Sequence, residues 1–131
     1  MESSIKATSK KEPVILERFY NSENNLHEIS IDEAGRGCMF GRVYIASVIL
    51  PKNPELFSGV DIKDSKKFSS KKKIHEMADY IKEHALVWNI EYIDADVIDR
   101  VNILSSVMKG MHTCISESIS KTTNITNIDH N

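Results

Sequence analysis

Two adjacent carboxylates, Asp32 and Glu33, stand where a short apolar strand is expected to end. Ile29 and Ile31 alternate with polar residues just before them, which is the pattern of a half-buried strand. A buried carboxylate without a counter-ion is costly, and carboxylate oxygens suit Mg²⁺ or Mn²⁺. The pair therefore indicates either a divalent metal site or an acidic turn after an edge strand. Because neighbouring strand residues point to opposite faces, both acids reach one metal only if the strand ends or bulges at Glu33.

A glycine-flanked loop, formed by Gly35, Arg36 and Gly37, follows the two acids. The run Asp-Glu-Ala-Gly-Arg-Gly resembles the signature of the type 2 ribonucleases H (ribonuclease HII), which cut RNA in RNA–DNA hybrids and at single ribonucleotides in DNA. The resemblance implies that Asp32 and Glu33 are two of the family's four catalytic, metal-binding acids. It also implies that the loop recognises the 2′-hydroxyl at the RNA–DNA junction. That hydroxyl distinguishes RNA from DNA, and glycines let the backbone approach a ligand closely.

The resemblance is imperfect further along the loop. The family usually has prolines directly after Gly37 and directly after Gly41, where this chain has Cys38 and Arg42. Cys38 shows no metal-ligand spacing with Cys114, so both are expected to be free thiols.

A basic segment, residues 63–69, forms a second candidate site. Its dense lysines beside a serine hydroxyl suit phosphate contact, and the alternative is a solvated basic loop. The family carries a similar Asp-Ser-Lys-Lys segment bordering its substrate groove, and an Asn-Ile-Leu run whose Asn lies beside the active site. The substrate-binding residues that the resemblance implies here are Asp64, Ser65, Lys66, Lys67 and Asn102.

A third catalytic and metal-binding acid would end a fourth, parallel strand in this family, and Asp129 falls near the expected place. The residues before Asp129 are polar, which is unusual for a buried parallel strand, and the glycine that follows the acid in the family is missing. The fourth acid and the family's substrate-stacking tyrosine have no counterpart. The chain is therefore expected to be the N-terminal part of the catalytic domain.

Hydrophobic periodicity predicts the elements that position these groups. The expected fold class is α/β: a ribonuclease H-like mixed sheet of three antiparallel strands, then helices leading to parallel strands, incomplete in this chain. Ser69 is expected to cap the first helix, and Gly110 to mark a close contact between the last helix and a strand. Strands are predicted at 27–33, 42–50 and 86–93, and helices at 70–84, directly after Asp94 and at 102–120.

Large apolar side chains in the last helix recur at helical spacing and are expected to face the core, as is Trp88 of the third strand. The predicted core stripe of that helix comprises Leu104, Val107, Met108, Met111, Ile115 and Ile119.

Composition limits the broader alternatives. At 131 residues the chain holds at most one domain, and its net charge of −2 provides no global basic field, so nucleic-acid binding must come from local patches. Residues 1–13 are expected to be a disordered lead-in, and 14–131 the N-terminal part of a ribonuclease H-like domain. No long apolar run and no leader is apparent, so we expect a cytoplasmic, intracellular protein without a membrane span.

The resemblance implies an endoribonuclease that uses Mg²⁺ or Mn²⁺ to hydrolyse the RNA strand of RNA–DNA hybrids, or DNA containing ribonucleotides, and that is a monomer when complete. Two open alternatives are a non-catalytic nucleic-acid-binding fragment and a truncated enzyme that lacks the remaining catalytic carboxylates.

Overall fold

The computed structural model describes residues 17–21, 23–24, 26–37 and 41–128, with side chains placed up to residue 124. None of the helices in this part of the chain is long and apolar enough to cross a membrane. Three of the sequence predictions lie outside the described residues: the lead-in at 1–13, Cys38 and Asp129.

One antiparallel sheet forms the centre of the fold, and its strands are β1 (Ile29–Ala34), β2 (Val43–Ile49) and β3 (Val87–Ile93). The spatial order is β1-β2-β3, so β1 is an edge strand among the described residues. Alternating β-branched residues explain why β2 forms the middle strand, since they suit a pleated surface with one buried face. The structure confirms all three predicted strands and the antiparallel pairing of the first two.

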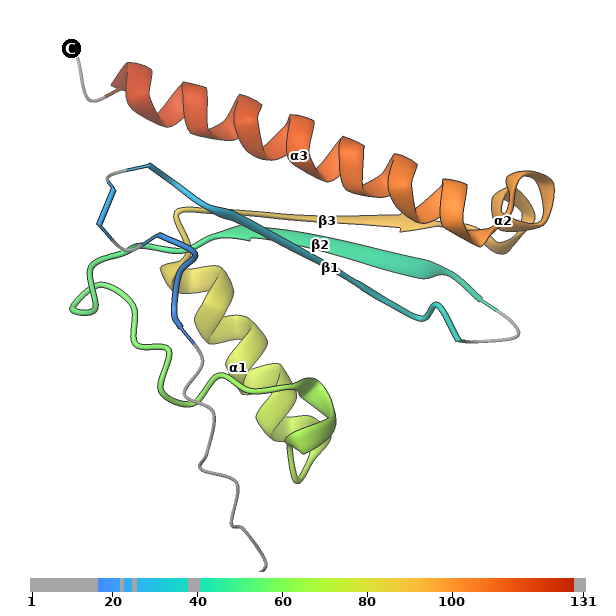
Figure 1. Ribbon diagram of the computed structural model, residues 1–131. Coiled ribbons are helices and arrows are strands. Elements are labelled where there is room, and N and C mark those ends of the chain that lie inside the picture. Colours follow the sequence, from blue (N-terminus) through green and yellow to red (C-terminus); the bar gives the residue numbers. More distant parts are fainter. Residues whose placement is uncertain (1–16, 22, 25, 38–40, 129–131) are drawn as a thin grey trace, which may run out of the picture.

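Helices cover the two faces of the sheet unequally (Figure 1). The long helix α3 lies along one face, whereas α1 lies below the other face and touches it mainly at one end. The predicted α/β class is therefore confirmed, with three antiparallel strands and helices around them. The helical elements are the 3₁₀ turn η1 (Ser65–Lys67), α1 (Lys71–His84), α2 (Ala95–Val101) and α3 (Ile103–Ile128).

The start of α1 differs by one residue from the prediction. Ser70, not Ser69, is the N-cap, and its hydroxyl accepts a hydrogen bond from the amide of Lys73 at 3.3 Å. Ser70 has the extended backbone that an N-cap requires, while the helix itself begins at Lys71. Cap positions shift in this way because two adjacent serines offer the same chemistry.

The core lies between α3 and the inner face of the sheet. Val43 and Ile45 of β2 pack there against Val107 and Cys114 of α3. Gly110 makes this contact close: a Cβ added to it would lie 2.1 Å from Cδ1 of Ile45. The close helix–strand approach predicted from Gly110 is confirmed. Cys114 is a buried free thiol, as predicted, and burial raises the pKa of this thiol.

The predicted core stripe of α3 is wrong for three of its six residues. Leu104, Met108 and Ile119 are exposed. The face that meets the sheet carries small residues instead, because α3 approaches β2 too closely for large side chains. Ser118 is fully buried, and its hydroxyl lies 2.9 Å from that of Ser47.

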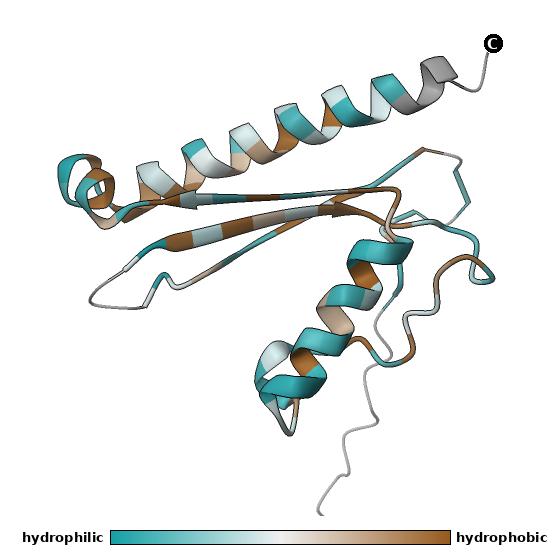
Figure 2. Cartoon of the chain, turned by 180° about the vertical axis from the view of Figure 1, so that it is seen from behind, coloured by the Kyte–Doolittle hydropathy of each residue, from teal (hydrophilic) through white to brown (hydrophobic). Residues whose placement is uncertain are grey.

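The outer face of the sheet, away from α3, exposes a row of large side chains: Tyr44, Trp88, Ile90 and Tyr92. We call these four residues the open face. Alternation along β2 separates this face from the buried one, and Figure 2 shows hydrophobic and less hydrophobic residues alternating along that strand. Trp88 was expected in the core, but its position on the open face leaves it 39% exposed. Its indole contacts lysine ammonium groups from α1 and α3 instead.

The end of α3 corrects a further expectation. The family resemblance implies a parallel strand directly before Asp129, yet α3 continues to Ile128. Threonine hydroxyls near this end are satisfied within the helix: Thr122 donates to the carbonyl of Ser118 at 2.8 Å, and Thr123 to that of Ile119 at 3.0 Å. A threonine hydroxyl can bond to the carbonyl four residues earlier within a helix, so these polar residues do not prevent α3 from continuing.

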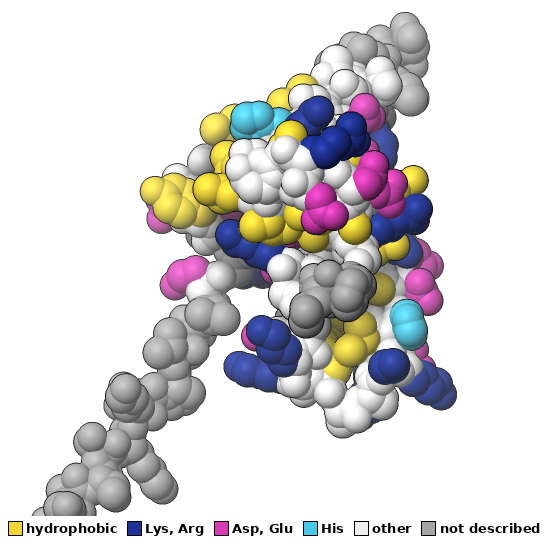
Figure 3. Space-filling model, turned by 90° about the vertical axis from the view of Figure 1, so that its right-hand side faces the viewer, with side chains coloured by type: hydrophobic (Ala, Val, Ile, Leu, Met, Phe, Trp, Pro, Cys, Tyr) yellow, Lys and Arg dark blue, Asp and Glu magenta, His cyan; other side chains and the backbone are white. Residues whose placement is uncertain are grey.

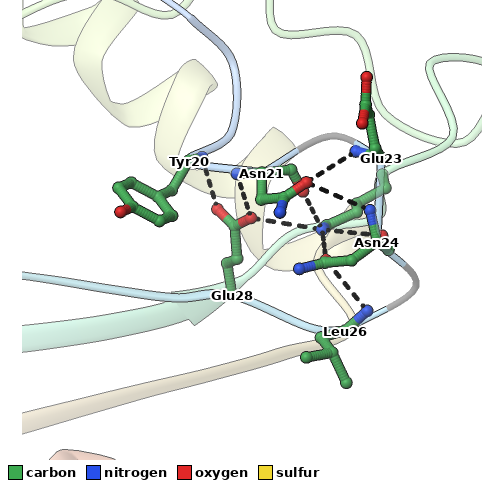
Figure 4. A network of polar contacts seen from close by, with 7 residues as sticks. Tyr20, Asn21, Glu23, Asn24, Leu26 and Glu28 are labelled. Carbon is green, nitrogen blue, oxygen red and sulfur yellow. Dashed lines mark hydrogen bonds and ion pairs between the residues drawn. The ribbon is translucent and has the colours of Figure 1, made fainter.

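A polar network fastens the segment before β1 (Figure 4). The carboxylate of Glu28 accepts hydrogen bonds from the amides of Tyr20 and Asn21, at 2.8 and 3.0 Å. The ammonium of Lys52 lies 3.3 Å from the same carboxylate and also donates to the carbonyls of Asn21 and Asn24. The two amide hydrogen bonds, with the lysine, lower the pKa of Glu28.

Candidate active site

The side chains of Asp32 and Glu33 point to opposite faces of the sheet. Strand β1 runs through to Ala34 with an unbroken register, in which Asp32 faces Ala46 and Glu33 faces Ile45. Asp32 is therefore exposed on the same side as the open face, while Glu33 is partly buried on the side of α3. The condition for a shared metal was that the strand end or bulge at Glu33, and the structure does not meet it. Continued pairing with β2 holds both residues in regular strand geometry.

Different polar contacts hold the two carboxylates. One oxygen of Asp32, Oδ1, accepts a hydrogen bond from the amide of Glu33 at 2.8 Å. Glu33 instead forms an ion pair with Arg36, with 3.4 Å between Nη1 and Oε1. Asp32 thus has a second oxygen free for a ligand among the described residues, whereas the charge of Glu33 is already compensated by the loop arginine.

The glycine-flanked turn closes tightly after β1. Gly35 has a φ of +91°, a conformation that side-chain-bearing residues rarely adopt. A Cβ on Gly35 would lie 2.7 Å from the carbonyl oxygen of Arg42, so the turn rests on the chain where it enters β2. A Cβ on Gly37 would meet no atom of the described residues within 4 Å, and Arg36 is exposed. The turn therefore presents Arg36 and Gly37 to solvent from a fixed base.

An ion pair that sequence reasoning missed stands beside this turn. Nε of Arg42 donates to Oδ1 of Asp94 at 2.5 Å, and the guanidinium lies 4.2 Å from the ring centroid of Tyr92. The hydrogen bond to Asp94 raises the pKa of Arg42. The sequence indicated Asp94 only as the cap of a short helix. Asp94 does occupy the N-cap position of α2, but its side chain makes no capping bond.

The basic segment forms the single 3₁₀ turn η1, which leads into α1. Asp64 caps this turn, because its carboxylate accepts from the amide of Lys66 at 2.9 Å. The side chains of Ser65, Lys66 and Lys67 are exposed, and within the described residues they make no hydrogen bond or ion pair. Asp64 is thus placed to shape the turn, and the other three side chains are free for a ligand.

Figure 3 views the end of the molecule from which these groups project. Lysine and arginine side chains lie on several parts of this view, and on its lower part they flank a group of hydrophobic side chains. The first turn of α1, which closely follows η1 in the chain, carries Lys71, Lys72 and Lys73. Because cations are disfavoured at a helix N-terminus, a bound anion would relieve their repulsion.

Asn102 lies at the corner between α2 and α3, at a distance in the chain from both candidate segments. Its φ is +83°, and its side chain accepts a hydrogen bond from the amide of Ser105 at 2.9 Å. Its carbonyl also accepts from the hydroxyl of Ser106 at 2.8 Å. These contacts give Asn102 a structural role at the helix start, and no polar contact in the described residues connects it with Asp32.

The described residues do not by themselves fit a two-metal centre. They contain no group of three or more histidine, cysteine or acidic side chains close enough to hold one ion. Asp32 and Glu33 also face opposite ways. Of the two adjacent acids, only Asp32 is exposed and without an ion pair among the described residues, just before the glycine-flanked turn.

The described residues form a three-stranded antiparallel sheet backed by a long helix, with two carboxylates near the end of its first strand. This arrangement, with the family match below, gives the class of the fold as α/β of the ribonuclease H type. The family described as Ribonuclease HII matches residues 29–131. Curated relatives named Ribonuclease HII include one from Cytophaga hutchinsonii, 38% identical over 112 residues, covering 86% of this chain and 53% of the relative. Another, from Parabacteroides distasonis, is 38% identical over 90 residues, covering 69% and 43%.

A third relative, from Oceanobacillus iheyensis, is 42% identical over 94 residues, covering 71% of this chain and 34% of its own. The chain therefore belongs to the ribonuclease HII family. It spans about half the length of the curated relatives it matches, or less.

Proposed function

We propose that the protein acts in endonucleolytic cleavage of the RNA strand of RNA–DNA hybrids, and of DNA at embedded ribonucleotides, by phosphodiester hydrolysis that depends on Mg²⁺ or Mn²⁺. The observation that carries the proposal is the junction of Asp32 with the turn Gly35–Gly37, within the region that matches the family. Asp32 is exposed on the side of the open face there, and Arg36, four residues further along the chain, is exposed in the turn and pairs with Glu33.

Each group has a defined task in this proposal. Asp32 would supply one carboxylate to the metal site through Oδ2, the oxygen that is not hydrogen-bonded to the amide of Glu33. Arg36 and Gly37 face the ribose of the substrate, where a 2′-hydroxyl can both donate and accept. Lys66 and Lys67 contact phosphates, which positions a nucleic acid without reading its sequence.

The remaining metal ligands must come from outside the described residues, because the described acids do not converge. Two features leave room for added structure. Strand β1, which carries Asp32, has an unpaired edge among the described residues, and exposed sheet edges readily accept another strand. The open face next to Asp32 is apolar, and large exposed apolar patches usually mark surfaces that another element covers.

A non-catalytic nucleic-acid-binding fragment is the second candidate function. Among the described residues no third carboxylate joins Asp32 and Glu33, which favours this candidate, as do the exposed lysines of η1. This candidate predicts that the chain binds nucleic acid without cleaving it, even when it is joined to the remaining length of a ribonuclease HII relative.

The test is cleavage by a completed chain, in which residues 1–131 are followed by the part of the Cytophaga hutchinsonii relative beyond the matched region. Labelled RNA–DNA hybrid, DNA duplex with one ribonucleotide, all-DNA duplex and double-stranded RNA are compared with Mg²⁺, with Mn²⁺ and with EDTA. The proposal expects metal-dependent cutting of the first two substrates only. Binding of the substrates without cutting would favour the second candidate, provided that the intact relative cuts them in parallel.

A further inference from the structure

Asp94 occupies an N-cap position but does not use its side chain as a cap. Aspartate is among the preferred N-cap residues because its carboxylate can accept a hydrogen bond from a free helix amide. In α2 only the carbonyl of Asp94 takes part, accepting from the amides of Val97 and Ile98. The carboxylate turns instead to Arg42, 2.5 Å away. The side chain of Asp94 therefore forms a tertiary ion pair with Arg42 in place of the local capping hydrogen bond.

Arg42 is held from two sides. Its Nε donates to Asp94, and its guanidinium stacks over the ring of Tyr92 at 4.2 Å. Tyr92 pairs with Tyr44 across β2 and β3, so this contact fixes the arginine over the end of the sheet. The side chains of Arg42 and Asp94 are each 48% exposed. Exposed ion pairs contribute little to global stability, so the pair is better placed to fix a local position than to hold the fold.

The backbone of Arg42 supports the glycine-flanked turn. The carbonyl of Arg42 lies so near Gly35 that an added Cβ would approach it to 2.7 Å. Ala34, the residue before the turn, pairs with Tyr44, two residues after Arg42. The end of β1, the start of β2 and the start of α2 lie at the same end of the sheet (Figure 1). The contact with Asp94 therefore anchors the base of the turn to α2.

We propose that Arg42 and Asp94 form a positioning pair, which sets the orientation of the Gly35–Gly37 turn and thereby the preference for duplexes that contain a ribonucleotide. The inference rests on the proposed function, because the turn must face the ribose. Neither residue has to touch the substrate. The pair acts through the main chain at Arg42, and its loss would let the turn shift relative to β1.

The test is equilibrium binding of the 131-residue chain to two fluorescent duplexes of the same sequence, one with a single ribonucleotide and one all DNA. The variants are Arg42→Ala and Asp94→Ser, and serine keeps an N-cap residue so that only the ion pair is lost. Arg100→Ala is the matched control. Arg100 pairs with Asp96 within α2 at 3.4 Å, a longer distance than the 2.5 Å between Arg42 and Asp94. Arg42→Lys tests rescue, since an ammonium can reach Asp94 but cannot form the planar stack.

The inference expects the ratio of the two affinities to fall roughly threefold or more in each single variant, and no further in the double variant, as coupled residues behave. The control should keep the ratio, Arg42→Lys should restore part of it, and melting temperatures should change only slightly.

Three outcomes contradict the inference in different ways. If the parent prefers the ribonucleotide-containing duplex and neither single variant changes the ratio of the two affinities, the inference is wrong and the proposed function is unaffected. Equal losses on both duplexes, with a salt slope reduced by about one, overturn it in favour of a direct phosphate contact by Arg42. If the unaltered chain binds both duplexes equally, the proposed ribose recognition fails and the inference fails with it.

Discussion

Replacing Gly110 by alanine adds one methyl group where α3 approaches the sheet. The new Cβ would lie 2.1 Å from Cδ1 of Ile45 and 3.1 Å from Cδ1 of Ile93. Both distances are shorter than ordinary carbon–carbon contacts of about 3.5–4.0 Å. Ile45 is fully buried, so its side chain has little room to move away. The substitution therefore either distorts the side chains or moves the helix.

The expected magnitude is the difference of two effects. Overpacking a core typically costs about 1–3 kcal/mol, while alanine gains about 1 kcal/mol over glycine in a helix interior. We expect Gly110→Ala to lower the free energy of unfolding by about 1 kcal/mol, within a range of about 0–2 kcal/mol. Urea unfolding followed by circular dichroism measures this change, and Lys109→Ala, an exposed neighbour, should have almost no effect.

A second background separates the two effects. Ile45→Val removes the clashing Cδ1 and alone costs about 0.5–1.5 kcal/mol. With the clash relieved, Gly110→Ala in that background should be neutral or stabilising, which gives a positive coupling between the two sites. Stabilisation by Gly110→Ala with Ile45 intact would refute the reasoning, because it would mean that α3 does not approach β2 this closely.

Three other predictions follow from the surface groups. Lys66→Ala and Lys67→Ala should each reduce the slope of log affinity for nucleic acid against log salt concentration by about one. An unchanged slope with unchanged affinity would mean that the lysines of η1 are solvated and contact no phosphate. Because Glu28 has a lowered pKa, its contacts stabilise the fold above the ordinary glutamate value of 4.5 and are lost as pH falls through the lowered pKa. The protection factor of the Asn21 amide against hydrogen exchange should therefore fall at acid pH in the parent but not in Glu28→Gln, and identical pH profiles of the protection factor would exclude this role. The 131-residue chain should associate through the β1 edge and the open face, whereas the completed chain should elute from size-exclusion chromatography as a monomer; a monodisperse 131-residue monomer would contradict this.

Periodicity was sufficient to predict the strands and helices, because most of them bury one face only. It failed along α3 for a physical reason. Hydropathy selects the largest apolar side chains, yet the close approach to β2 places Gly110, Cys114 and Ser118 at the interface. Large residues such as Met108 are consequently exposed. Small residues on a helix carry little hydropathic signal, and their role becomes visible only when the distance between helix and sheet is known.

The candidate site shows a similar limit. The chemistry of Asp32 and Glu33 could be recognised from their type and order, but their directions depend on whether β1 bulges, which the pairing with β2 decides. Asp94 could be predicted as an N-cap because capping is local. Its contact with Arg42 spans distant parts of the chain, so no local pattern could predict it.

The central claim is that Asp32 is a catalytic carboxylate of a ribonuclease HII. The most direct measurement is the initial rate at which the completed chain cuts an RNA–DNA hybrid at saturating Mg²⁺, with Asp32→Asn compared with the parent. Asp79→Asn, which changes an exposed acid on α1, is the matched control. The claim predicts that Asp32→Asn abolishes cleavage with an unchanged circular dichroism spectrum, while Asp79→Asn keeps the parental rate. A rate for Asp32→Asn within about tenfold of the parent, a barrier difference of only about 1.4 kcal/mol, would contradict it.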